Sequence, residues 1–152
     1  MPSPEPTVSS SNLAEQLVRL TRRMHRAQKH HLEHLDIAFT PAQSRLLRIV
    51  GHYRDTPPRM ADLAERLEVV PRAVTTLVDA LEANGAVRRV PDTANRRVVR
   101  IELTDAGRST LRVLRSARQA AAEDILAPLT AEQREVLGGL LATLVDGPGT
   151  HH

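Results

Sequence analysis

The stretch Arg59–Gly107, RMADLAERLEVVPRAVTTLVDALEANGAVRRVPDTANRRVVRIELTDAG, decides the fold. Apolar residues spaced three and four apart predict a helix at about 61–67 and a second one at 71–84, which Gly85 ends. Apolar alternation at 86–90 and at 98–103 predicts two strands, and 92–95 supplies the turn between them. Two short helices followed by a hairpin in this order predict a winged helix-turn-helix, which places one helix in a DNA groove and a hairpin beside it.

Longer helices are predicted on both sides of this stretch. Asn12 resembles an N-cap for a helix that ends near Asp36, and Thr40, followed by Pro41 and Gln43, begins the next helix. Thr104 caps a helix that continues to about Leu126, and a capping box at 130–133 begins the last one. The fold class is therefore mainly α with a small β-hairpin wing.

The apolar faces of these flanking helices are too extensive for the small core of the DNA module to cover. A two-fold homodimer built from both ends of the chain would cover these faces. We therefore expect a flexible arm at 1–11, a dimerisation helix at 12–38 and a winged helix-turn-helix at 39–103. C-terminal dimerisation helices follow at 104–146, and a flexible tail at 147–152.

Composition narrows the function further. The chain has 152 residues and no cysteine, which excludes disulfides, thiol nucleophiles and thiolate metal sites. Phe39 and Tyr53 are the only residues among Phe, Tyr and Trp, which argues against stacking on single-stranded nucleic acid. No apolar run has membrane-spanning length and the N-terminus does not resemble a signal peptide, so we expect a cytoplasmic protein with no membrane partner.

The helix at 71–84 has one apolar face and one polar face. Four apolar residues share the first, namely Val74, Leu77, Val78 and Leu81. Arg72, Thr75 and Thr76 lie on the other, after Pro71 at the first helical position. An arginine there can bind guanine O6 and N7, and a threonine can contact a base, a phosphate or a thymine methyl. The alternative is an ordinary solvated face.

The hairpin carries a second group of cations. Arg96 and Arg97 follow the turn and suit the negative potential of a minor groove, and Arg89 on the incoming strand joins the predicted DNA contacts. Asp92 is spaced to form an ion pair with one of the two turn arginines, which would stiffen the wing. The alternative is a generic charged hairpin.

These motifs together resemble the MarR (multiple antibiotic resistance regulator) family. The matching segments are LAERL (63–67), TTLVDALEANGAVRR (75–89), D-x-x-N-R-R (92–97) and VRIELTDAG (99–107), and the resemblance covers about 12–146. It implies a dimeric transcription regulator, usually a repressor, on a pseudo-palindromic duplex. Recognition helices would enter successive major grooves, wings would enter minor grooves, and a small-molecule effector would release the DNA.

The sequence departs from the family pattern at several positions. Glu68, Val69 and Val70 stand where Gly-Val-Ser is common, so the usual serine cap is missing, although Pro71 preorganises the first turn. Asn95 replaces a usual aspartate, and Thr76 often corresponds to a basic residue. The missing cap at Val70 supports an alternative, a helical protein-interaction module that no longer binds DNA.

A histidine cluster lies in the first long helix. HHLEH (30–34) formally matches the zinc peptidase signature H-x-x-E-H, but no further ligand or substrate cleft is evident, so we expect no enzyme. His30, Glu33 and His34 could instead hold a regulatory zinc ion, which makes a zinc-responsive regulator the alternative function. Another interpretation is that His31 packs in the dimer interface while the other histidines are solvated or line an effector pocket.

Overall fold

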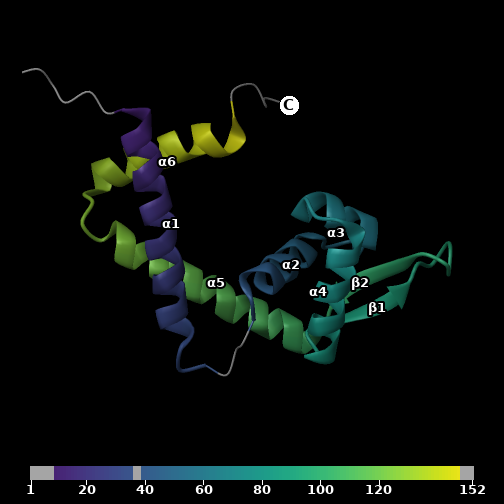
Figure 1. Ribbon diagram of the computed structural model, residues 1–152. Coiled ribbons are helices and arrows are strands. Elements are labelled where there is room, and N and C mark those ends of the chain that lie inside the picture. The colour runs from purple at the N-terminus through teal and green to yellow at the C-terminus, as the bar shows by residue number, and fades with distance from the viewer. Residues whose placement is uncertain (1–8, 36–38, 148–152) are drawn as a thin grey trace, which may run out of the picture. The chain divides into compact units, whose positions relative to one another are not determined.

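The computed structural model describes residues 9–35 and 39–147. These residues form helices and one antiparallel hairpin, which confirms the predicted fold class (Figure 1). In chain order the elements are α1 (Ser10–Leu32), α2 (Pro41–His52), α3 (Met60–Leu67), α4 (Pro71–Ala83), β1 (Val87–Pro91), β2 (Val99–Leu103), α5 (Asp105–Leu126) and α6 (Ala131–Asp146).

The chain divides into two compact units. The described parts of Met1–Glu33 and Arg118–His152 form one, called the helical unit below, and those of His34–Ala117 form the other, called the winged unit. The first half of α5 therefore belongs to the winged unit, beyond the expected domain boundary at residue 103. The expected boundary at residue 103, between the DNA-binding and the dimerisation segments, stays a prediction.

Side-chain caps set most of the helix starts. Thr40 accepts a hydrogen bond from the Gln43 amide at 3.2 Å and its own amide donates to the Gln43 side chain at 3.1 Å, so the predicted capping box is present. The box at Thr130 has the same form. At α1 the prediction was wrong, because Ser9 rather than Asn12 is the N-cap and accepts from the Asn12 amide at 3.2 Å. The helix consequently begins inside the expected flexible arm.

α1 also ends before the expected residue Asp36. Its last helical residue is Leu32, and His34 lies in a turn. Residues 36–38 lie outside the described part of the chain, as do residues 1–8 of the expected arm and 148–152 of the expected tail.

The core of the winged unit lies between α2, α3, α4 and the hairpin. The largest fully buried side chains there are Leu46, Leu47, Leu63, Leu81, Ile101, Val74, Val78, Val87 and Pro58. Each buried leucine, isoleucine or valine stabilises the fold by about 1.5–3 kcal/mol relative to an exposed one. The predicted apolar face of α4 is thereby confirmed, with Leu77 half-buried at its edge.

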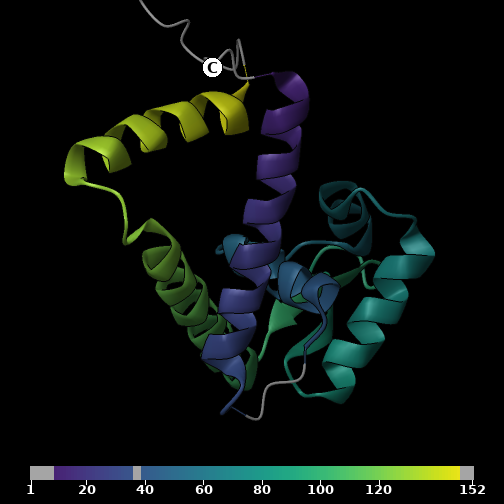
Figure 2. The same cartoon turned by 60° about the vertical axis from the view of Figure 1, so that its left-hand side comes forward.

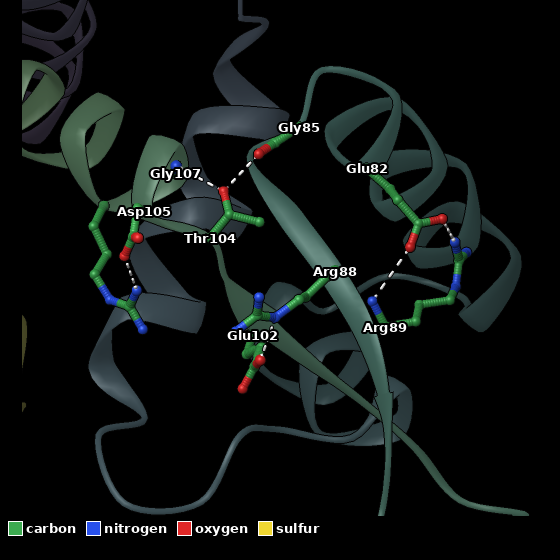
Figure 3. A network of polar contacts seen from close by, with 9 residues as sticks. Glu82, Gly85, Arg88, Arg89, Glu102, Thr104, Asp105 and Gly107 are labelled. Carbon is green, nitrogen blue, oxygen red and sulfur yellow. Dashed lines mark hydrogen bonds and ion pairs between the residues drawn. The ribbon is translucent and has the colours of Figure 1, made fainter.

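Thr104 joins the end of the hairpin to the start of α5 and to the end of α4 (Figure 3). Its hydroxyl accepts from the Gly107 amide at 3.0 Å and donates to the Gly85 carbonyl at 2.5 Å. A Cβ on Gly107 would lie 1.9 Å from the Ala86 carbonyl oxygen, so only glycine fits there. Backbone atoms therefore fix the hairpin base against the first turn of α5.

The turn between α3 and α4 contains an unusual backbone conformation. Glu68 has φ 55° and ψ 44°, the left-handed region, and ends α3. The next amide, that of Val69, donates to the Ala64 carbonyl at 3.1 Å. Left-handed geometry favours glycine, because the Cβ of other residues crowds the backbone.

The helical unit leaves long apolar faces uncovered. α1 and α6 contain no buried residue, and Figure 2 shows both helices at full length. Their exposed large apolar residues are Leu13, Leu17, Val18, Leu20, Val136, Leu140, Leu141, Leu144 and Val145. None of the helices in the described ranges is long and apolar enough to cross a membrane.

Candidate nucleic-acid interface

The polar face of α4 is exposed at the positions that the sequence predicted. Arg72, Thr75 and Thr76 are all exposed, and Pro71 occupies the first helical position. Among the described residues, no hydrogen-bond or ion-pair partner holds the Arg72 guanidinium. This side chain therefore keeps its full set of donors for a ligand outside the chain.

The start of α4 lacks a side-chain cap, as its sequence indicated. Val70 is the N-cap, with φ −68° and ψ 149°, and its side chain forms no capping hydrogen bond. Its carbonyl accepts from the Ala73 amide at 3.0 Å. The Val70 side chain is 67% exposed, so an apolar group stands at the open end of the helix.

Both threonine hydroxyls point back to the helix backbone. Thr75 Oγ1 donates to the Pro71 carbonyl at 3.2 Å, and Thr76 Oγ1 donates to the Arg72 carbonyl at 3.2 Å. A hydroxyl has one proton, so each of these groups has no further proton to donate to a base or a phosphate.

Arg89 was predicted to contact DNA; its guanidinium forms ion pairs within the protein, and a contact with DNA stays a prediction. Its guanidinium lies between two carboxylates of α4, at 2.5 Å from Asp79 and 2.6 Å from Glu82. Figure 3 shows the contact with Glu82. The Arg89 amide also donates to Glu82 at 3.2 Å. The hydrogen bond to Asp79 raises the pKa of Arg89 above its ordinary value. Arg89 therefore neutralises the acidic end of α4 and ties it to β1.

Residue spacing contains no direct indication of this arrangement, because it depends on how the strand docks against the helix. Asp79 lies on the exposed face of α4, where an unpaired carboxylate would repel phosphate. The neighbouring Arg88 points elsewhere and pairs with Glu102 across the hairpin (Figure 3).

The tip of the wing is a tight polar turn that presents two arginines. Arg96 and Arg97 are exposed, and no carboxylate among the described residues forms an ion pair with either of them. Asn95 shapes this turn: its side-chain oxygen accepts from the Arg97 amide at 3.1 Å, and its own amide donates to Asp92 at 3.2 Å. The uncharged Asn95 side chain therefore stabilises the turn without neutralising Arg96 and Arg97.

Asp92 does form an ion pair in the wing, but not with a turn arginine as expected. Its partner is Arg100, at 2.7 Å, and both side chains are nearly buried, 13% and 14% exposed. The bond from Arg100 lowers the pKa of Asp92 below its ordinary value. The hairpin register pairs Pro91 with Val99, which places Arg100 diagonally across from Asp92 on the same face.

Arg100 also connects the wing to the segment before α3. Its guanidinium donates to the Pro57 carbonyl at 2.7 Å, and the next amide, that of Ile101, donates to the Pro58 carbonyl at 2.9 Å. Sequence reasoning missed Arg100; its position two residues beyond the cross-strand neighbour of Asp92 was the available signal. This residue fixes the orientation of the hairpin on the helices.

The histidine cluster does not form the metal site that its motif suggested. Within the described ranges, no group of three or more histidine and acidic side chains is arranged to hold a metal ion. His30 lies 3.7 Å from Glu33, while His31 pairs instead with Asp124 of α5 at 2.7 Å. His34 lies in the turn after α1, where the helical spacing assumed for a zinc site is lost. The zinc-sensor alternative is therefore not supported.

Comparisons with known proteins place this geometry among transcription regulators. The MarR family model matches residues 39–99, which contain the helix-turn-helix and most of the wing. The HTH-type transcriptional repressor MdtR of Bacillus subtilis (strain 168) is 32% identical over 111 residues, which cover 73% of this chain and 70% of that protein.

Solved structures extend the likeness to the whole fold. A crystallised mutant of MarR from E. coli has a TM-score of 0.72 and 25% identity, covering 88% of this chain and 96% of that one. The transcriptional repressor CouR, solved on a 23-mer DNA duplex, has a TM-score of 0.73 and 23% identity, covering 95% of this chain and 99% of its own. The second likeness concerns the fold alone.

Proposed function

Because this chain belongs to the MarR family of winged helix-turn-helix transcription regulators, we propose that it is a homodimeric repressor of a pseudo-palindromic double-stranded DNA operator. The exposed arginines of the winged unit are the main support for this proposal. At two separate elements this unit exposes arginines that form no ion pair with another described residue, Arg72 on α4 and Arg96 with Arg97 on the wing, while Arg89 pairs with the two carboxylates of α4, Asp79 and Glu82.

The roles of these residues follow from their chemistry and place. Arg72 on the first turn of α4 would enter the major groove and bind a guanine through two hydrogen bonds. Thr75 and Thr76 would line the same groove. Arg96 and Arg97 would lie along the minor groove, where narrow A·T-rich segments concentrate negative potential. Residues 39–103 constitute the DNA-binding domain in this proposal.

The exposed apolar faces of the helical unit support the dimer. Leu144 and Val145 of α6 are 70% and 81% exposed, and α1 presents Leu13 and Leu17 in the same way. A second copy that covers these faces would remove a large apolar area from water. We therefore assign residues 12–38 and 104–146 to dimerisation. Each dimer would carry two recognition helices, as a pseudo-palindromic operator requires.

Control by a small-molecule effector is proposed from family membership, and the described residues carry no observation that selects the effector. The relatives are transcription regulators, and we assign no catalytic activity to this chain. A DNA-binding regulator of this kind would act in the cytoplasm.

The experiment that tests the proposal is selection of genomic fragments by the purified full-length protein, followed by sequencing. The expected result is a pseudo-palindrome with half-sites about one helical turn apart, bound by a dimer in analytical ultracentrifugation. If no motif is enriched above a mock selection, sequence-specific DNA binding is wrong and the interaction-module interpretation replaces it.

A further inference from the structure

The open end of α4 presents methyl groups at a position where the family pattern has a hydrogen-bonding serine. Val70 replaces a capping side chain and is 67% exposed. Val69 beside it is 38% exposed, and the Pro71 ring is exposed as well. These apolar side chains are adjacent in the chain, and in the proposed complex the N-terminal end of α4 faces base edges.

The threonines of this face contribute methyl groups rather than donors. Because each hydroxyl donates to a carbonyl one turn earlier, Thr75 and Thr76 retain acceptor lone pairs and a methyl group for any external partner. Asp79, one turn further on, is held by Arg89. Within the described part of the chain, Arg72 is thus the one exposed side chain between residues 69 and 79 with uncommitted hydrogen-bond donors.

Thymine is the base that suits such a surface. Its 5-methyl group projects into the major groove, and valine, alanine or threonine methyl groups contact it favourably. We propose that α4 reads thymine 5-methyl groups by apolar contact through Val70, Thr75 and Thr76, with Arg72 as its hydrogen-bonding reader. This inference rests on the proposed function and adds the base feature that the operator must present.

Uracil tests the inference directly, because it differs from thymine only by the missing methyl group. The operator recovered by genomic selection is synthesised with each thymine replaced in turn by uracil, and the full-length protein is titrated by fluorescence anisotropy. Burial of one methyl group is worth about fourfold in affinity. We expect that decrease at one or two thymines of each half-site and no change at thymines outside the half-sites.

Three variants identify the side chains responsible. Val70→Ala removes two methyl groups, while Thr75→Ser and Thr76→Ser each remove one methyl and keep the hydroxyl and its backbone bond. In the responsible variant, the ratio of thymine to uracil affinity falls toward one. This ratio is independent of the fraction of folded protein. Val99→Ala is the matched control, since Val99 is a 38% exposed valine on the wing strand β2, and the minor groove displays no thymine methyl.

The possible outcomes separate this inference from the proposed function. The protein could prefer the operator over a scrambled duplex while every uracil substitution leaves the affinity unchanged. In that case the recognition of thymine methyl groups is wrong, and the proposed sequence-specific DNA binding is still supported. If uracil weakens binding equally in the wild type and in all three α4 variants, these side chains are not the readers and the inference fails. Equal binding to operator and scrambled duplexes overturns both.

Discussion

The guanidinium of Arg89 on β1 lies 2.5 Å from the carboxylate of Asp79 on α4 and ties the strand that leads into the wing to the proposed recognition helix. The same guanidinium reaches Glu82 one turn further along. Arg89, which the sequence predicted to contact DNA, is thus paired with two carboxylates of the protein itself. We expect Arg89 to affect DNA binding indirectly, through the charge and the position of α4.

Arg89→Met should lower affinity for every duplex, cognate or scrambled, because two uncompensated carboxylates would then approach the phosphates. Since Asp79 and Glu82 are well exposed to water, the decrease in the free energy of unfolding should be no more than about 1 kcal/mol. Anisotropy titrations and urea denaturation measure the two effects. Arg88→Met is the matched control, and an equal decrease of affinity in that variant would contradict the indirect role of Arg89.

Arg72→Ala should weaken binding to the operator by about 1–3 kcal/mol, because the two hydrogen bonds to guanine can no longer form. Binding to a scrambled duplex should change much less. The ratio of the two dissociation constants is the quantity to measure. A decrease of the same size on both duplexes would mean that Arg72 binds phosphate instead of a base.

Arg96→Ala should reduce the salt dependence of binding. If Arg96 neutralises one phosphate, the slope of log K against log salt should become shallower by about 0.9 when that arginine is removed. Titrations at several salt concentrations measure this slope. Arg134→Ala is a suitable control, because Arg134 pairs with Glu123 in the helical unit at 3.1 Å. An unchanged slope in Arg96→Ala would remove Arg96 from the interface.

The Asp92–Arg100 pair predicts a dependence of stability on pH. Arg100 lowers the folded-state pKa of Asp92, whereas the unfolded chain titrates near pH 4. The pair therefore stabilises the fold above about pH 4 and stops doing so as the pH falls through the folded-state pKa. The difference in unfolding free energy between wild type and Asp92→Asn should shrink as the pH falls from about 6 to about 3. A constant difference would show that the charge of Asp92 contributes nothing.

Glu68→Gly should stabilise the protein by about 0.5–1 kcal/mol. Glycine accepts the left-handed conformation at φ 55° without crowding, and this gain exceeds the extra entropy that glycine has in the unfolded chain. Chemical denaturation measures the change. Glu65→Gly, inside α3, should instead destabilise by about 1 kcal/mol. Destabilisation by both variants would mean that the Glu68 side chain makes a contribution larger than its backbone cost.

Features that depend on neighbours in the sequence were predictable, and features that depend on docking were not. The capping boxes at Thr40 and Thr130 join residues three apart, so the sequence alone contains both partners. Asn12 was mistaken for a cap because Ser9, three residues earlier, is an equally good one. The partner of Asp92 depends on hairpin register, and the partners of Arg89 on how β1 meets α4. Spacing identifies Arg100 as the partner of Asp92 only once the hairpin register is known, and it gives no indication of the partners of Arg89.

The close approach at Gly107 has a mechanical consequence. The Ala86 carbonyl oxygen accepts the Thr104 amide at 3.1 Å and occupies the place that a Cβ of residue 107 would fill. Backbone atoms touch there directly, without side-chain rotamers that could absorb a displacement. The first turn of α5 and the base of the hairpin are therefore in rigid contact, and we expect a rotation of one to move the other.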